Sequence, residues 1–250
     1  MLQTVQEDID SMLNHNYYAP RTPTFYISGS GNDAIRKMFG ARGYKRVFKV
    51  VDADFVVFPG GADINPLLYG EPVRKGTGMS LTQDREDIDT LRSCLASDKQ
   101  VKIGICRGAQ FLNVMVGNGR LYQHVNNHGT AHEAIEIDTK RRFNVSSTHH
   151  QMMIPGPTGK VLLGAEAVAR ERCTYDSKFI VPPGSPFIDP EAVLYLEENT
   201  FCFQPHPEHE LPRYHECTQF FFDTISCYFL SKVQEDALKE NLKSRKKGSK

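Results

Sequence analysis

The stretch that most constrains this chain is residues 102–114, which read KIGICRGAQFLNV. A short apolar run ends at Ile105, Cys106 follows between two glycines, and apolar residues with helical spacing come next. This order predicts a strand, a tight turn and a helix, with a nucleophilic side chain on the turn. Such a nucleophile elbow requires a base, an orienting acid and an oxyanion site from the rest of the chain.

The residues around Cys106 suit this geometry. A side chain raised on a sharp turn crowds the positions two before and two after it, and Gly104 and Gly108 have no Cβ to clash there. The turn also directs the first backbone N–H groups of the following helix at the sulfur. These unpaired donors and the positive end of the helix favour the thiolate over the thiol.

Strands and helices are predicted to alternate through the first half of the chain. The predicted strands are 24–28, 54–58 and 101–105, and the predicted helices are 33–42 and 83–99. This alternation favours an α/β fold with a doubly wound, mostly parallel sheet. The ligand crevice of such a sheet lies at the carboxyl ends of its strands, where both Gly60-Gly61 and Cys106 fall.

The C-terminal half adds a hairpin and a compact source of a base and an acid. Residues 193–196 and 200–203 flank a polar turn and predict two antiparallel strands. The second strand runs into Gln-Pro-His-Pro-Glu, which ends at Glu208. Side chains two positions apart on an extended segment point the same way, so Glu208 can orient His206. A long core-covering helix is predicted beyond Leu211.

Composition excludes several classes of function. The net charge is zero, which gives no electrostatic reason to expect a nucleic-acid or membrane partner. No apolar run approaches the roughly 20 residues that span a bilayer. The first residues lack the pattern of a secretory signal. The six cysteines form no CxxC pair, so we expect reduced thiols in the cytoplasm.

Two groups of histidines could imitate a metal site. His124, His128 and His132 are spaced four apart, but the asparagines, glycine and threonine between them break any helix. The second group surrounds His206 and includes Glu208, but prolines and the lack of HExxH spacing argue against metal binding there. The sequence therefore predicts no metal site.

Four motifs occur in a characteristic order: PGGADINPLLYGEP, GICRGAQFLNV, SSTHHQ and FQPHPE. In this order and spacing they resemble the class I glutamine amidotransferases. The resemblance is greatest to the branch of γ-glutamyl-γ-aminobutyrate hydrolase-like cysteine peptidases, and it covers roughly residues 25–210. It implies a flavodoxin-like, class I glutamine amidotransferase-like sheet. We expect one such domain over 1–250, with an N-terminal helical extension at 1–20 and a basic, disordered tail at 239–250.

The resemblance implies a role for each matching residue. Cys106 resembles the nucleophile, His206 the general base and later acid, and Glu208 the acid that orients it. The backbone N–H groups of Gly61 and Arg107 resemble the oxyanion hole. The residues that match substrate-contacting positions are Gly60, Asp63, Gln110, Ser147, His149 and His150.

The implied reaction cleaves the γ-amide of glutamine or of a γ-glutamyl amine through a γ-glutamyl thioester, and it needs no metal or organic cofactor. Two versions stay open, because both use the same catalytic residues. One is a glutaminase that delivers ammonia to a separate synthetase chain, and the other is a self-sufficient hydrolase of γ-glutamyl amines. A homo-oligomer also stays open. The intact set of Cys106, His206 and Glu208 argues against a non-catalytic binding module.

Overall fold

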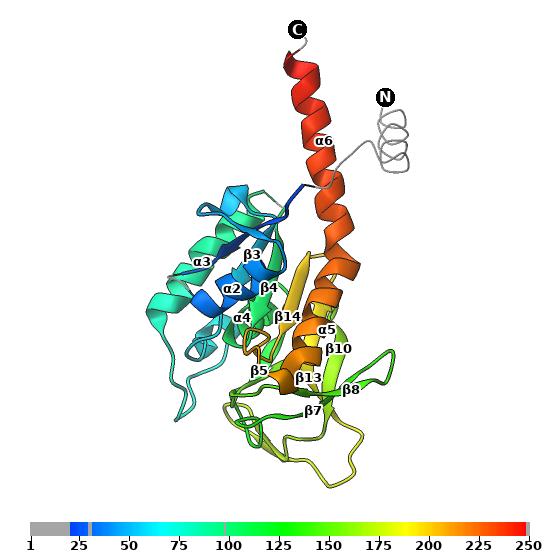
Figure 1. The fold of residues 1–250 in the computed structure, drawn as a ribbon. Coiled ribbons are helices and arrows are strands. Elements are labelled where there is room, and N and C mark those ends of the chain that lie inside the picture. Colours follow the sequence, from blue (N-terminus) through cyan, green and yellow to red (C-terminus); the bar gives the residue numbers. More distant parts are fainter. Residues whose placement is uncertain (1–20, 30–31, 98, 249–250) are drawn as a thin grey trace.

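A nine-stranded sheet organises the computed structural model, which describes residues 21–29, 32–97 and 99–248 (Figure 1). The strand order is β2-β1-β3-β4-β14-β13-β10-β7-β8. The N-terminal helix predicted within residues 1–20 lies outside the described residues.

One half of the sheet is parallel. It consists of β2 (Lys45–Arg46), β1 (Thr24–Ile27), β3 (Phe55–Phe58), β4 (Val101–Ile105) and β14 (Thr200–Phe203). Strands β3, β4 and β14 are buried along their whole length, as expected for parallel strands with both faces covered. The predicted doubly wound α/β fold is confirmed, and the carboxyl ends of β3, β4 and β14 meet at one edge.

The other half is antiparallel and larger than the predicted hairpin. It consists of β13 (Ile188–Tyr195), β10 (Lys160–Glu166), β7 (His132–Glu136) and β8 (Arg142–Val145). Two small sheets lie beside it. One pairs β12 (Lys178–Ile180), β11 (Glu171–Cys173) and β6 (His124–Val125), and the other pairs β5 (Arg120–Tyr122) with β9 (Met152–Ile154).

Helices cover both faces of the parallel half. One face packs against α2 (Asp33–Ala41) and α5 (His215–Ile225), whose buried aromatic rings include Phe39 and Phe221. The opposite face packs against α3 (Leu81–Leu95) and α4 (Arg107–Met115). Short 3-10 turns occur at η1 (Val50–Asp52), η2 (Pro66–Tyr69) and η3 (Pro212–Tyr214).

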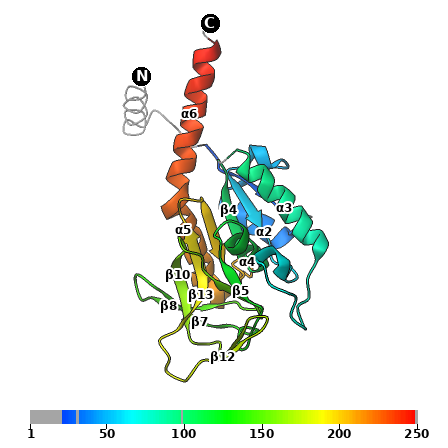
Figure 2. The same cartoon turned by 180° about the vertical axis from the view of Figure 1, so that it is seen from behind.

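The C-terminal helices form one long, continuous helical segment. A π-helical segment, η4 (Ser226–Leu230), joins α5 to α6 (Ser231–Gly248). Both views show α6 projecting beyond the sheet (Figures 1 and 2). Helix α6 includes most of residues 239–250, for which the sequence predicts a disordered tail. Buried Ala237 and Leu238 anchor its first half, and the lysine-rich continuation contains good helix formers. None of the helices in the described segments is long and apolar enough to cross a membrane.

Candidate active site

Cys106 occupies the predicted elbow. Strand β4 ends at Ile105, and Cys106 is the N-cap residue of α4, with a φ of 52°. Positive φ is uncommon for a residue with a Cβ, and such strain concentrates at functional sites. The backbone N–H of Cys106 donates to the carbonyl of Phe203 at 2.8 Å, which fixes the elbow to β14. As the first residue of α4, Arg107 has a backbone N–H without an acceptor inside the helix.

The two glycines around the elbow are required by close backbone contacts. A Cβ on Gly104 would lie 2.4 Å from the carbonyl oxygen of Gly108. A Cβ on Gly108 would lie 2.0 Å from the carbonyl oxygen of Phe58 on β3. The predicted need for glycine is met, although the neighbour that excludes a side chain at Gly108 is strand β3 rather than the cysteine.

Replacing Gly104 with alanine is expected to destabilise the elbow, because backbone atoms of α4 must shift to admit the methyl group. We expect a loss of roughly 1–3 kcal/mol in the free energy of unfolding, measured by urea denaturation. Gly40→Ala is the matched control. No atom lies within 4 Å of that Cβ position, and Gly40 lies within α2, where alanine is the better helix former. Equal stability of the two variants would contradict this account of the elbow.

His206 and Glu208 follow the end of β14, next to the elbow. The Nδ1 atom of His206 lies 2.8 Å from Oε1 of Glu208, as the two-residue spacing predicts. Ser146 holds the histidine backbone on both sides. The His206 N–H donates to its hydroxyl oxygen at 2.9 Å, and that hydroxyl donates to the His206 carbonyl at 3.0 Å. Ser146 opens the SSTHHQ motif, but its role was not predicted, because its contact with His206 spans two distant parts of the chain.

The pKa of His206 depends on its two neighbours, Cys106 and Glu208. Burial alone would lower the pKa of His206, but its interactions with Cys106 and Glu208 outweigh this and raise the pKa to about 10. The imidazolium form is therefore favoured beside the sulfur. The side chains of Cys106, His206 and Glu208 thus lie together at the carboxyl ends of β4 and β14, with Glu208 hydrogen-bonded to His206.

Gly60 allows the end of β3 to approach the side chains of Cys106 and His206. A Cβ on Gly60 would lie 2.9 Å from Cε1 of His206 and 3.7 Å from Cβ of Cys106. The side chain of Gln83 packs directly on Gly61 and donates from Nε2 to the Gly60 carbonyl at 3.2 Å. Gln83, at the start of α3, was not singled out from the sequence, and it sets the position of the Gly60-Gly61 backbone.

A pocket of about 240 Å³ opens beside Cys106. It brings together most of the residues predicted to contact substrate, and its lining includes Gly61, Asp63, Arg107, Gln110, His149 and His150. Two of them form an ion pair across it, with His150 Nε2 at 3.0 Å from Asp63 Oδ2. The hydrogen bond to Asp63 raises the pKa of His150, whereas burial lowers the pKa of His149 to about 4.

Two predicted substrate contacts fall outside the lining of this pocket. Gly60 borders a neighbouring pocket of about 500 Å³. The Ser147 hydroxyl is buried and donates to the carbonyl of His128. Gln110 lines the pocket, but its amide group donates to the Gln151 carbonyl at 3.2 Å. The structure thus places Ser147 in a loop contact and Gln110 in the wall of the pocket.

The side chain of Arg107 forms a buried ion-pair network that the sequence did not reveal. Its guanidinium group binds both Asp84 and Asp87 of α3, and all three side chains are buried. Asp87 also accepts from the hydroxyl of Ser28, and Asp84 accepts from the backbone N–H of Asn65 at 3.2 Å. This network attaches the first turn of α4 to α3, behind the elbow.

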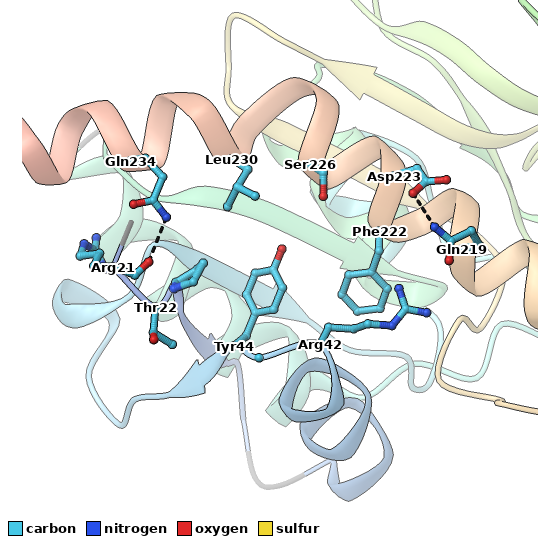
Figure 3. A pocket seen from close by; sticks show the side chains of 12 residues that line it. Arg21, Thr22, Arg42, Tyr44, Gln219, Phe222, Asp223, Ser226, Leu230 and Gln234 are labelled. Carbon is cyan, nitrogen blue, oxygen red and sulfur yellow. Dashed lines mark hydrogen bonds between the residues drawn. The ribbon is translucent and has the colours of Figure 1, made fainter. Parts of the chain in front are cut away.

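A larger pocket of about 510 Å³ lies away from Cys106, between the C-terminal helices and the segment before β1 (Figure 3). Arg42, Tyr44 and Phe222 line it, and Gln234 donates to the carbonyl of Arg21 at 2.9 Å across one end (Figure 3). The guanidinium group of Arg42 stacks on the ring of Phe222, 4.4 Å from its centroid. Among the described residues that line it, no nucleophile is paired with a base.

The family model of Peptidase C26 matches residues 41–168, just over half of the chain. The chain therefore belongs to the Peptidase C26 family, within the class I glutamine amidotransferase-like superfamily. The matched span contains Cys106 and the residues of the pocket, and it ends before His206 and Glu208.

Curated relatives carry related names. A glutamine amidotransferase-like protein of Lactococcus lactis subsp. lactis, YvdE, is 36% identical over 98 residues, which are 39% of this chain and 39% of that protein. A glutamine amidotransferase of Schizosaccharomyces pombe is 33% identical over 116 residues, or 46% of this chain and 44% of that protein. The matches thus span less than half of the length of these two relatives.

Solved structures share the fold. A protein from Thermoplasma acidophilum, described as part of a GMP synthase, has a TM-score of 0.54 at 14% identity, covering 90% of this chain and 100% of that chain. A glutamine amidotransferase from Thermotoga maritima has a TM-score of 0.50 at 13% identity, covering 89% and 95%. At these identities the likeness concerns the fold alone.

Proposed function

We propose that this protein is a cysteine-dependent amidohydrolase that cleaves the γ-amide of glutamine or of a γ-glutamyl amine. Cys106 is the nucleophile, His206 the general base and acid, and Glu208 the orienting acid. The observation that carries the proposal is the placement of His206, hydrogen-bonded to Glu208, next to Cys106 on a strained elbow, beside a small polar pocket.

The chemistry follows from the positions of these groups. The Cys106 thiolate adds to the γ-carbonyl carbon, and the oxygen that becomes negative is held by the N–H groups of Gly61 and Arg107. Losing one such donor typically costs about 100- to 1,000-fold in rate. The C–N bond breaks as imidazolium His206 gives its proton to the departing nitrogen. His206 then takes a proton from water, which adds to the thioester carbonyl, and glutamate leaves as the thiolate is restored.

The pocket beside Cys106 suits a small zwitterionic head group. It carries a carboxylate, Asp63, and an imidazole, His150, within its wall. These groups can pair with the α-ammonium and α-carboxylate of a glutamyl group, while its γ-carbonyl reaches the sulfur. We therefore propose Asp63, Gln110, His149 and His150 as the substrate-facing set, with Ser147 supporting the loop behind it.

The pH profile of kcat/KM tests the role of Glu208. The His206 pKa is raised, so its stabilising interactions are complete below the unfolded value of about 6.5 and are lost as pH rises through about 10. Activity should fall through the same alkaline range, because the imidazolium proton is needed for the leaving group. Glu208→Gln removes one of the groups that raise the pKa. The alkaline limb should therefore move to lower pH, and an unmoved limb would contradict the proposed role.

A substrate panel tests the proposed reaction and its two versions. Steady-state glutamate release is measured with glutamine and with γ-glutamyl amines such as γ-glutamyl-GABA and γ-glutamylputrescine. Rapid turnover of the amines with little on glutamine supports the self-sufficient hydrolase. Glutamine turnover that rises with cell lysate supports an ammonia-delivering protein, for which the structural neighbour described as part of a GMP synthase is a precedent in fold. No release from any substrate, with or without lysate, would contradict both.

A further inference from the structure

Three histidines and a glutamate converge in the interior, behind the wall of the Cys106 pocket. We call His128, His132, His149 and Glu191 the histidine cluster. His128 and Glu191 are completely buried, His149 is 5% exposed, and the side chain of His132 is 9% exposed. The members come from four separate parts of the chain: the loop after β6, the start of β7, the loop before β9 and strand β13.

The ring nitrogens surround the carboxylate of Glu191. Oε1 of Glu191 lies 3.0 Å from Nε2 of His132 and 3.3 Å from Nδ1 of His128. Its Oε2 atom lies 3.9 Å from Nε2 of His149. One ligand atom from each of His128, His132 and Glu191 falls within a span of 4.8 Å. Adjacent ligands of a tetrahedral zinc ion are separated by roughly 3.3 Å, given metal–nitrogen bonds of about 2.0–2.1 Å.

The other nitrogen of each ring lies within hydrogen-bond distance of an acceptor. Nε2 of His128 lies 3.0 Å from the Asp189 carboxylate, Nδ1 of His132 lies 3.2 Å from the Thr130 carbonyl, and Nδ1 of His149 lies 2.8 Å from the Gln151 carbonyl. An imidazole that binds a metal through one nitrogen donates from the other in this way. Asp189 is itself held by Arg172 and by the backbone N–H of Ala169.

Three of the inward-facing atoms lack a hydrogen bond, whereas Nε2 of His132 is hydrogen-bonded to Oε1 of Glu191. Nδ1 of His128, Nε2 of His149 and Oε2 of Glu191 are buried without a hydrogen-bond partner among the described residues. A neutral imidazole has a single N–H, and every ring here lies between the Glu191 carboxylate and a second acceptor. An unpaired buried polar group costs about 1–3 kcal/mol, and a bound cation would give these three atoms a partner.

We propose that the histidine cluster binds one divalent transition-metal ion of the zinc type, with His128, His132 and Glu191 as its core ligands and His149 as the fourth. Three imidazoles and a carboxylate are a ligand set that zinc favours. The ion would satisfy all the inward-facing atoms at once. It would also fix the His149 ring, which lines the Cys106 pocket. Its role is to position the pocket wall, and the sulfur chemistry of Cys106 does not require it.

The convergence of His128 and His132 does not depend on helical spacing. His128 and His132 indeed do not share a helix, because His132 begins β7. His132 and Glu191 converge because β7 and β13 both pair with β10, on its two edges, and His128 contacts both from the loop after β6. The rings of His128 and His132 approach with centroids 4.7 Å apart.

Metal content of the full-length chain, without an affinity tag, tests the proposal. The protein is incubated with Zn²⁺, passed through gel filtration and analysed for metal. We expect about one ion per chain. In parallel, Co²⁺ should give the intense visible absorption of a tetrahedral site. Glu191→Gln and His132→Ala should each bind at least about 10-fold more weakly. His124→Ala is the matched control, because His124 is an exposed histidine of the same segment, and it should bind as the wild type does.

Thermal unfolding of the wild type gives a second readout that needs no variant. Zn²⁺ should raise the Tm, a chelator should reverse the rise, and Mg²⁺ should have no effect. Wild-type protein that retains no Zn²⁺ and shows no shift in Tm would overturn the proposal and leave the cluster as a hydrogen-bonded network. Binding that survives Glu191→Gln and His132→Ala but is lost in His209→Ala would also overturn it, because the ion would then lie at the group formed by His206, Glu208 and His209.

Discussion

Replacing Cys106 with serine is expected to reduce glutamate release by roughly 1,000-fold or more, because a serine hydroxyl is far less ionised and less nucleophilic than a thiol. The replacement is close to isosteric, and the elbow is held by backbone contacts rather than by the sulfur. The free energy of unfolding should therefore stay within about 1 kcal/mol of the wild type. Initial rates on the best substrate of the panel, together with urea denaturation, measure the two effects.

Cys227→Ser is the matched control for this experiment. Cys227 is the exposed member of the six cysteines, all of which are free. Its replacement should leave the rate unchanged. A Cys106→Ser variant that keeps most of the wild-type rate would remove the nucleophile from the proposed reaction. Equal loss in both variants would point to a general effect of thiol replacement.

Replacing Arg107 with methionine is expected to have the largest effect on stability. The substitution keeps most of the aliphatic volume but leaves Asp84 and Asp87 buried without a counter-ion. Removing one partner of a buried ion pair costs about 3–5 kcal/mol, because the remaining charge has lost both its hydration and its partner. Urea denaturation of the variant should therefore show a loss of this size.

Arg92→Met is the matched control, because Arg92 also pairs with an aspartate of α3 but at the surface. Its partner Asp89 is 3.1 Å away, and both side chains are more than 60% exposed. Exposed pairs contribute about 0–1 kcal/mol, so the control should remain close to the wild type. A loss below about 1 kcal/mol in Arg107→Met would show that the network does not stabilise the elbow.

The order of elements around the site could be predicted because it depends on local patterns. The elbow at Cys106 and the strand that runs into His206 each depend on a short segment of sequence. The glycine positions, the apolar runs and the two-residue spacing of His206 and Glu208 are enough to predict them. The parallel half of the sheet follows from the alternation of such segments. The orientation of Glu208 toward His206 needed no knowledge of distant contacts.

The supporting groups could not be predicted, because they depend on contacts between distant segments. Apolar spacing in α3 favours Leu95 as part of its packed face, yet Leu95 is 56% exposed whereas Asp87 is 1% exposed. The buried guanidinium of Arg107 draws the two aspartates inward and so overrides hydrophobic periodicity. The pairing of β13 with β14 likewise places Glu191 in the interior. No local sequence pattern predicts that Glu191 lies close to His132 there.

The most direct test of the central account is covalent labelling with a glutamine analogue that carries an electrophilic diazoketone at the γ-position. Intact mass and peptide mapping follow the label. We predict one adduct per chain, on Cys106, formed faster than on any other cysteine and prevented by excess substrate. His206→Ala should slow the labelling, and Cys106→Ser should abolish it. A folded protein that takes no label, or that takes it faster on another cysteine than on Cys106 when no substrate is present, would contradict the account.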